Sequence, residues 1–311
     1  MARGHPRAIW FQHREEHVPG PLFLRRERML PYTYLSPAII LIGAILLYPV
    51  ASGILLSLFN RDAYNPSPAF VGLKNYLLLA KDQTFFLALW HTLWWALSVL
   101  IGQYLLGLVL ALLLNKRIRG RAVFRAIILT PWVIPPAVAA ITWKWIYEEQ
   151  YGILNSILMF LGILRTHVAW LGTEGTAMWA LITAGIWQGI PFVAIVLLAG
   201  LQAIPLDEYE AAKIDGANSW QSFRYVTLPH LTGISFIVII LSTIWNINQF
   251  ELTYILTRGG PGNATQVLST YTYQLFFSAF QFSTAATVAT VMLLILMVLT
   301  GFYIRRIIYP R

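Results

Sequence analysis

Cysteine and charge are what this chain has least of. None of its 311 residues is cysteine, which excludes disulfides, thiolate metal sites and cysteine nucleophiles. Only 11% of the residues are charged, whereas a soluble domain carries about a quarter. Hydrophobic residues make up 58% of the chain, and that much apolar surface cannot be hidden inside a single soluble core. The composition therefore predicts a membrane protein.

The chain also lacks the common signatures of an energy source or an enzyme. No Gly-Lys dipeptide occurs, so there is no Walker A loop, and neither GxSxG nor a GxGxxG that follows a strand is present. His13 and His17 have a spacing that suits a metal on a helix, but no third ligand stands near them. We therefore expect no catalytic residue, no metal and no cofactor on this chain.

Six apolar runs are long enough to cross a bilayer, since a span needs about 20 residues. Their approximate bounds are Tyr34–Phe59, Phe85–Leu114, Ala122–Tyr147, Met178–Ala203, Gly233–Leu256 and Ala285–Ile308. A seventh run, Ile153–Leu164, is too short to span and is expected to lie in the interface or to pack as a short external helix. The sequence thus predicts an all-α membrane protein with six transmembrane helices, in which the first helix (34–59) precedes a core at residues 85–308.

Lysine and arginine are unevenly divided between the two sides of this arrangement. One side carries sixteen of the 22 basic residues, namely Arg3, Arg7, Arg14, Arg25, Arg26, Arg28, Lys116, Arg117, Arg119, Arg121, Arg125, Lys213, Arg224, Arg305, Arg306 and Arg311. Because cytoplasmic loops hold the excess of basic residues, both termini are predicted to be cytoplasmic, with residues 1–33 as a charged tail. The first apolar run is too long for a cleavable signal peptide. This bias accounts for the net charge of +9, so nucleic-acid binding is not expected.

The polar loop at residues 206–230 lies on that same side and has the pattern of two short helices. Asp207 and Glu210 have the spacing of a capping box at the start of the first helix. Gly216 is placed to end it, because glycine adopts a left-handed conformation at little cost. Asn218 is placed to cap the second helix. An ordered helix pair on the cytoplasmic side of a membrane protein suggests a docking surface for a partner in the water phase.

Spans three, four and five hold most of the polar or helix-breaking residues at membrane depth. Pro131, Pro135 and Pro136 must kink or break the third span, which is tolerated in lipid only where protein or water covers the freed backbone. The amides and hydroxyls are Gln188, Ser242, Asn246, Asn248 and Gln249, and the neighbouring rings are Trp132, Trp187, Phe192 and Trp245. Such a set suits a neutral hydrogen-bonding ligand such as a sugar. The alternatives are rings that only pack and amide bonds between helices, worth about 0.6–2 kcal/mol each.

The polar loop also carries a family signature. Glu210-Ala211-Ala212, Gly216 and Leu228-Pro229 match the spacing EAA-x3-G-x9-I-x-L-P, with Val226 at the isoleucine position. This resembles the EAA motif of bacterial ABC importer permeases. Four further sequence segments are similar to the carbohydrate-uptake (maltose/glycerol-3-phosphate) type of these permeases. They are FVGLKNY at 70–76, TPWVIPP at 130–136, LQAIPLDEYEAAKIDGA at 201–217 and LTRGGPGNAT at 256–265.

The resemblance implies a type I importer permease that is driven by a separate ATP-binding subunit. In such permeases the helix pair fits a cleft on that subunit, and ATP-driven closure switches the spans between inward- and outward-facing states. The implied contacts with the ATP-binding subunit are Glu210, Ala211, Ala212, Gly216, Leu228 and Pro229. The implied sugar contacts are Gly189, Phe192, Ser242, Trp245, Asn246 and Gln249. A tyrosine is possible at position 192, and its hydroxyl could bond to the sugar. Because Phe192 has no hydroxyl, that hydrogen bond can be absent.

The same resemblance implies the partners and the location. A second homologous permease, two ATP-binding subunits that hold ATP and magnesium, and an extracytoplasmic sugar-binding protein complete such a transporter in the lipid bilayer of a bacterial or archaeal cell membrane. One alternative is the same machinery moving glycerol-3-phosphate, another polyol or an amino acid. An anionic cargo needs a basic residue at its site, and Lys144 is the only one near the spans' polar residues. The other alternative is a channel or carrier working alone, but deep ionisable residues, which ion-coupled carriers need, are nearly absent.

Overall fold

The computed structural model describes residue 32 and residues 34–64, 67–116 and 119–308. The chain divides into two units, residues 1–52 and 53–311. Most of the predicted tail, with His13 and His17, lies outside the described residues. The described part of the first unit is helical and contains a π-helical turn, η1 (Gly43–Leu47), before the start of α2 (Tyr48–Leu56).

Within the described residues, five helices are long and apolar enough to cross a membrane, and one bent pair brings the number to six. The five are Tyr34–Leu56, α4 (Gln83–Asn115), α8 (Glu174–Gln202), Ser219–Ile247 and α14 (Phe282–Ile308). The bent pair is α5 (Arg121–Val133) and α6 (Pro136–Ile146). The prediction of an all-helical membrane protein is confirmed.

The third span is broken where the prolines stand. α5 and α6 meet at an angle of 95°. Ile134 and Pro135 both adopt extended backbone, with ψ of 127° and 138°, because each precedes a proline and is disfavoured in the helical region. Pro136 opens α6 at a position whose N–H has no helical partner in any case. The predicted break is therefore confirmed, although Pro131 remains inside α5.

The predicted fifth span, Gly233–Leu256, is wrong at both ends. Its helix consists of α10 (Ser219–Ser222), a π-helical turn η2 (Phe223–Thr227) and α11 (Leu228–Ile247). The π-helical turn comes just before Pro229, which has no N–H to donate to the helix. The helix ends at Asn248, whose side chain bonds back to the carbonyl of Ile244 at 2.8 Å, and such local bonds compete with helical ones. The second helix of the polar loop is thus the start of a membrane helix.

The remaining elements are short and lie between the spans. They are β1 (Phe59–Asn60), β2 (Ala69–Phe70), α3 (Lys74–Leu79), α7 (Ile153–Phe160), α9 (Leu206–Ile214), α12 (Glu251–Thr257), α13 (Leu268–Tyr273) and a π-helical turn η3 (Gln274–Ser278). β1 and β2 pair antiparallel and add a minimal two-residue ribbon to the helical fold. α7 confirms that the short apolar run forms a helix of its own.

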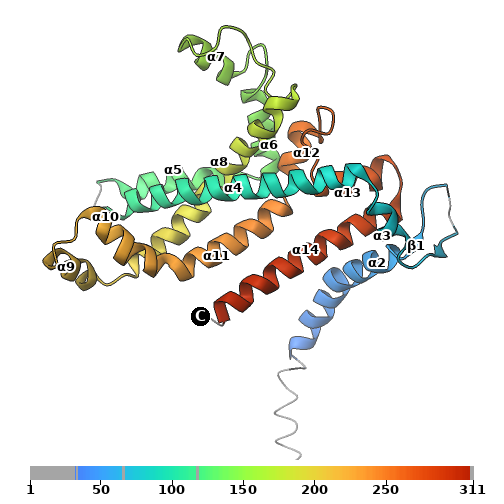
Figure 1. Ribbon diagram of the computed structural model, residues 1–311, viewed down its shortest axis with the longest axis horizontal. Coiled ribbons are helices and arrows are strands. Elements are labelled where there is room, and N and C mark those ends of the chain that lie inside the picture. The colour runs from blue at the N-terminus through green and yellow to red at the C-terminus, as the bar shows by residue number, and fades with distance from the viewer. Residues whose placement is uncertain (1–31, 33, 65–66, 117–118, 309–311) are drawn as a thin grey trace, which may run out of the picture. The chain divides into compact units, whose positions relative to one another are not determined.

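In the second unit, α4 and α8 pack along each other and α11 packs against both (Figure 1). Small residues allow this close approach, as is common between membrane helices. A Cβ on Gly107 of α4 would lie 2.6 Å from the Val193 side chain of α8. In Figure 1, α9 and α10 lie near the end of α4 that leads into α5, whereas α6, α7 and α12 group away from it.

Candidate functional site

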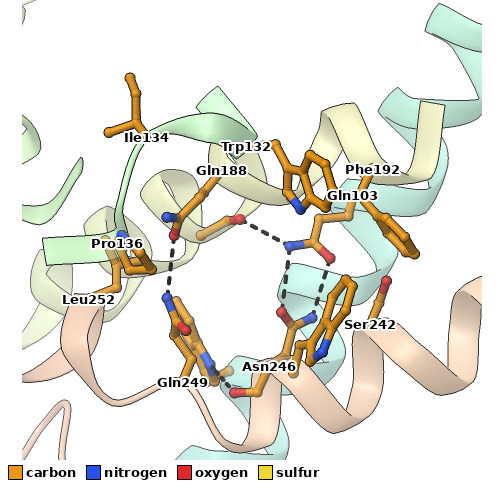
Figure 2. A pocket seen from close by; sticks show the side chains of 14 residues that line it. Gln103, Trp132, Ile134, Pro136, Gln188, Phe192, Ser242, Asn246, Gln249 and Leu252 are labelled. Carbon is orange, nitrogen blue, oxygen red and sulfur yellow. Dashed lines mark hydrogen bonds between the residues drawn. The ribbon is translucent and has the colours of Figure 1, made fainter. Parts of the chain in front are cut away.

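A cavity of about 200 Å³ lies among α4, α5, α6, α8, α11 and α12 (Figure 2). All six residues predicted to contact a sugar line it, namely Gly189, Phe192, Ser242, Trp245, Asn246 and Gln249. The structure thus brings together positions that are up to 60 residues apart in the chain. None of the described residues that line this cavity is charged. Its polar groups can exchange hydrogen bonds with a neutral ligand but offer no ion pair.

Four side-chain amides supply most of the polar lining. Gln103 Nε2 donates to the Gly185 carbonyl at 3.0 Å, and the Gln103 and Asn246 amides face each other at 3.4 and 3.5 Å. Gln249 Nε2 donates to Gln188 Oε1 at 3.3 Å. Three of these four distances exceed the usual range of about 2.7–3.2 Å for N–H···O bonds. The amides are therefore weakly engaged with one another, and a ligand hydroxyl can replace them at small cost.

Gln103 is the lining residue that the sequence analysis missed. It lies on α4, is 5% exposed, and reaches across to α8 and α11 (Figure 2). Its amide rests against Gly189, where a Cβ would lie 2.0 Å from Gln103 Nε2. Gly189 therefore has a role beyond facing the cavity, because its missing side chain leaves room for this amide. An isolated glutamine inside an apolar span was the available signal, since polar groups in membrane helices usually serve packing or function.

Aromatic rings form the other part of the lining. Phe192 and Trp245 meet edge to face with centroids 4.7 Å apart, and Trp132 lies 6.1 Å from Phe192. Trp132 is 50% exposed and Trp245 47% exposed, so both retain free ring surface. Trp187 does not line the cavity and packs edge to face on Trp143 instead. The prediction that Trp187 stacks on a ligand is therefore not supported, whereas the other three rings are in place.

The charged residues described nearest to the spans' polar groups lie outside the cavity lining. Lys144 and Glu251 are exposed and do not line it. Trp95 is buried and donates from Nε1 to the Asn246 carbonyl at 2.9 Å, which helps to position Asn246. In the described part of the chain, no three His, Asp or Glu side chains gather as metal ligands would.

The polar loop ends its first helix as predicted but begins it differently. α9 starts at Leu206 after Pro205 and has no side-chain cap, so the predicted capping box of Asp207 and Glu210 is wrong. Asp207 lies inside the first turn, where its charge still favours the positive end of the helix. Gly216 adopts the left-handed φ of +80° expected of a helix stop.

The second half of the loop is capped as predicted. Asn218 accepts from the Gln221 N–H at 2.9 Å, and the Gln221 side chain accepts from the Asn218 N–H at 2.8 Å. This reciprocal pair is a complete capping box. Of the signature residues, Glu210, Ala211, Gly216 and Pro229 are exposed, and Ala212 and Leu228 are partly buried. The signature therefore presents an accessible surface.

Two side-chain contacts tie α9 to the start of α11. Tyr209 and Thr227 share a hydroxyl–hydroxyl bond of 2.9 Å. His230 Nε2 lies 3.1 Å from the Glu208 carboxylate, and its Nδ1 lies 2.8 Å from the Val226 carbonyl. Both ring nitrogens thus face oxygen atoms of the loop. α9 is therefore connected to the membrane helix by specific side-chain contacts.

Comparison with known proteins assigns this architecture to a family. The family model described as "Binding-protein-dependent transport system inner membrane component" matches residues 103–311. The trehalose/maltose transport system permease protein MalF of Thermococcus litoralis is 39% identical over 81% of this chain and 84% of its own length. The sulfoquinovosyl glycerol transport system permease protein SmoG of Agrobacterium fabrum is 34% identical over 90% of both chains.

Solved structures have the same fold. A chain of a bacterial ABC transporter that imports the acidic polysaccharide alginate superimposes with a TM-score of 0.77 at 24% identity, over 91% of this chain and 98% of that chain. A second structure of the alginate transporter, in complex with an alginate pentasaccharide-bound periplasmic protein, matches equally well. This chain therefore belongs to the family of binding-protein-dependent transport system inner membrane components, the multi-pass permease subunits of ABC importers, and is a transport protein rather than an enzyme.

Proposed function

We propose that this permease carries a sugar and that the cavity in Figure 2 is where the sugar passes. The observation that carries the proposal is the composition of the described lining, which combines four neutral amides and a hydroxyl with four aromatic side chains and no charge. Amide groups both donate to and accept from sugar hydroxyls. Aromatic rings cover the apolar face of a pyranose. Ligand sites of this kind are mostly apolar with a few placed polar groups.

The names of the relatives support the same class of cargo. MalF of Thermococcus litoralis is named for trehalose and maltose, and SmoG of Agrobacterium fabrum for sulfoquinovosyl glycerol. An anionic cargo such as glycerol-3-phosphate is disfavoured for this chain, because the exposed Lys144 stands outside the lining. The cavity of about 200 Å³ is smaller than the roughly 300–1,000 Å³ of most ligand pockets. It therefore suits a single sugar ring, and a longer saccharide requires it to open.

The second part of the proposal is that the polar loop receives the driving force. Glu210, Ala211, Ala212, Gly216, Leu228 and Pro229 contact an ATP-binding subunit in this proposal. ATP and magnesium are held by two such subunits, a second homologous permease completes the membrane part, and an extracytoplasmic protein delivers the sugar. Support comes from the exposure of the loop and from its ties to α11.

The test is uptake by the assembled transporter in proteoliposomes. The ligand that co-purifies with the cognate binding protein is identified by mass spectrometry and offered in radiolabelled form. We expect uptake that needs both ATP and the binding protein and that excess neutral sugar, but not glycerol phosphate, abolishes. Competition by glycerol phosphate alone would contradict a neutral cargo, and uptake by this chain without ATP-binding subunits would contradict the importer.

A further inference from the structure

A second cavity lies at the end of α4 that carries most of the basic residues. It has a volume of about 610 Å³ and lies between the last turn of α4, the first loop helix α9, and α10. Lys116 of α4 and Lys213 of α9 both line it. By the distribution of lysine and arginine, this end of the bundle faces the cytoplasm. The cavity is separate from the one proposed for the sugar, and no residue is common to the two linings.

The lining is rich in donors and has no acid. Asn115, Ser219, Ser222 and Trp220 accompany the two lysines, and no Asp or Glu is among the lining residues. In the described part of the chain, the ion pair found is His230 with Glu208, and neither Lys116 nor Lys213 takes part in it. Lys116 and Lys213 thus line the same cavity, and no acid among its described lining residues balances their charge, which suits an anion.

The arrangement of α9 explains why the charge is unbalanced. Tyr209 and Lys213 are four residues apart and share the face of α9 that lines the cavity. The acidic residues Glu210 and Asp215 of the same segment are exposed and are absent from that lining. The helix thus directs its basic side toward α4 and its acidic side away from it.

An apolar track leads from the outer surface of α4 into this cavity. Leu105, Val109 and Leu112 follow the spacing i, i+4 and i+7, so they lie on one face of α4, and Lys116 comes directly after the end of this helix. Leu105 is 56% exposed and Val109 52% exposed, while Leu112 and Lys116 line the cavity. An apolar surface at bilayer depth that ends at a positive charge matches a molecule with an acyl chain and an anionic head.

We propose that this cavity binds the phosphate headgroup of an anionic phospholipid of the cytoplasmic leaflet. Lys116 and Lys213 hold the phosphate, and an acyl chain lies along Leu105 and Val109. Basic pockets at the cytoplasmic ends of membrane helices bind such headgroups. The apolar track favours a lipid over free phosphate, because free phosphate has no apolar group to contact these side chains. Because the two lysines belong to α4 and α9, a bound lipid links the polar loop to a membrane helix, and the anionic lipid content of the membrane would influence how freely α9 moves.

The test measures lipid binding by the full-length chain in detergent by native mass spectrometry, with phosphatidylglycerol as the probe and phosphatidylcholine as the neutral comparison. Each basic residue near an anionic membrane surface contributes about fivefold in affinity, so Lys116→Gln with Lys213→Gln is expected to weaken phosphatidylglycerol binding by about 25-fold. Lys116→Arg with Lys213→Arg keeps the charge and is expected to retain binding. Lys74→Gln with Lys81→Gln, in and just after α3, is the matched control and should change nothing.

Three results would overturn the proposal. One is equal binding of phosphatidylglycerol by the glutamine pair and the parent chain. Another is full displacement of the lipid by millimolar inorganic phosphate, which would assign the cavity to a free anion. The third is unchanged lipid binding together with lost association of the ATP-binding subunit, which would assign the lysines to an acidic protein surface. Because the experiment measures lipid binding and not transport, its result does not depend on whether the proposed sugar cargo is correct.

Discussion

The sugar cavity and the polar loop are built in opposite ways. The cavity is assembled from six helices, and its buried or partly buried amides contact one another across helix boundaries. The loop is a local structure whose stop, at Gly216, and cap, at Asn218, lie two residues apart. The cavity therefore depends on how the bundle packs, whereas the loop depends on its own sequence and on two contacts with α11. With the roles proposed above, recognition of cargo and reception of force lie in separate regions, so substitutions in the two regions should fail in different ways.

The largest effect is expected from Gly216→Asp. Position 216 has φ +80° and open space around it, so the substitution strains the backbone and changes the exposed docking surface without disturbing the bundle. Membrane insertion should be normal, while sugar-stimulated ATPase activity should fall by more than about tenfold, which corresponds to some 1.4 kcal/mol lost from the docking contact.

A matched control for this substitution exists in the chain. Gly120 also has a left-handed φ, +78°, and open space around it, but it lies before α5 rather than in the loop. Gly120→Asp should therefore leave coupling intact. Normal uptake and normal stimulated ATPase in an assembled Gly216→Asp transporter would remove the loop from the mechanism.

The next largest effect is expected from Gly189→Ala, which should damage cargo binding and leave coupling intact. The new Cβ would lie 2.0 Å from Gln103 Nε2 and would drive this amide away from Gly185 and Asn246. Interhelical hydrogen bonds in bilayers contribute about 0.6–1.7 kcal/mol each, so the loss of one should raise the KM for uptake roughly three- to eighteenfold.

A second substitution tests whether Gln103 is the cause. The double variant Gln103→Ala with Gly189→Ala should raise the KM for uptake no more than Gln103→Ala alone. Without the Gln103 amide, the new Cβ at position 189 has nothing to clash with. Gly233→Ala on α11, where nothing lies within 4 Å, should be silent. Additive effects of the two substitutions would show that Gly189 acts independently of Gln103.

A smaller effect is expected from Trp245→Leu, which removes one ring of the cavity wall. Aromatic contacts contribute about 0.5–1.5 kcal/mol beyond the area they cover, so the KM for uptake should rise about three- to tenfold while stimulated ATPase remains at saturating sugar. Trp179→Leu is the control, because Trp179 is 57% exposed on α8 and does not line the cavity. Equal losses in both variants would mean that the rings contribute to packing rather than to recognition.

The smallest effect is expected from Glu208→Gln, which weakens the tie between α9 and His230. Half-exposed ion pairs contribute about 0.2–1 kcal/mol, so stimulated ATPase activity should fall less than about fivefold. Glu210→Gln, on the same helix but in the proposed docking surface, should have the larger effect. The reverse order would indicate that the loop depends on its internal tie more than on its contact with the partner.

Local features of the chain could be predicted from sequence, and distant ones only in part. The break at Pro135 and Pro136, the stop at Gly216 and the cap at Asn218 each follow from one residue and its neighbours. The apolar runs gave the spans because each must be long enough to cross a bilayer. The start of α9 was misjudged because Pro205 places the first turn two residues earlier than a capping Asp207 requires.

The lining of the cavity could be predicted from the sequence only in part. The six predicted lining residues lie on α8, α11 and the turn after it, and their resemblance to a family made them visible. Gln103 lies more than 80 residues before the first of them, and only the packing of α4 on α8 brings it to Gly189. The end of α11 was misjudged for a related reason, because the apolar run continues into α12 across a polar turn at Asn248.

The most direct test of the central claim, that this permease is driven from the cytoplasm through its polar loop, uses the absence of native cysteine. Asp215→Cys in the loop and Phe160→Cys in α7, both exposed positions, are labelled with a membrane-impermeant maleimide in right-side-out and inside-out vesicles. We expect Phe160→Cys to react only in right-side-out vesicles, and Asp215→Cys to react only in inside-out vesicles and to be protected when the ATP-binding subunits are present. Labelling of Asp215→Cys in sealed right-side-out vesicles would place the loop outside the cell and contradict the claim.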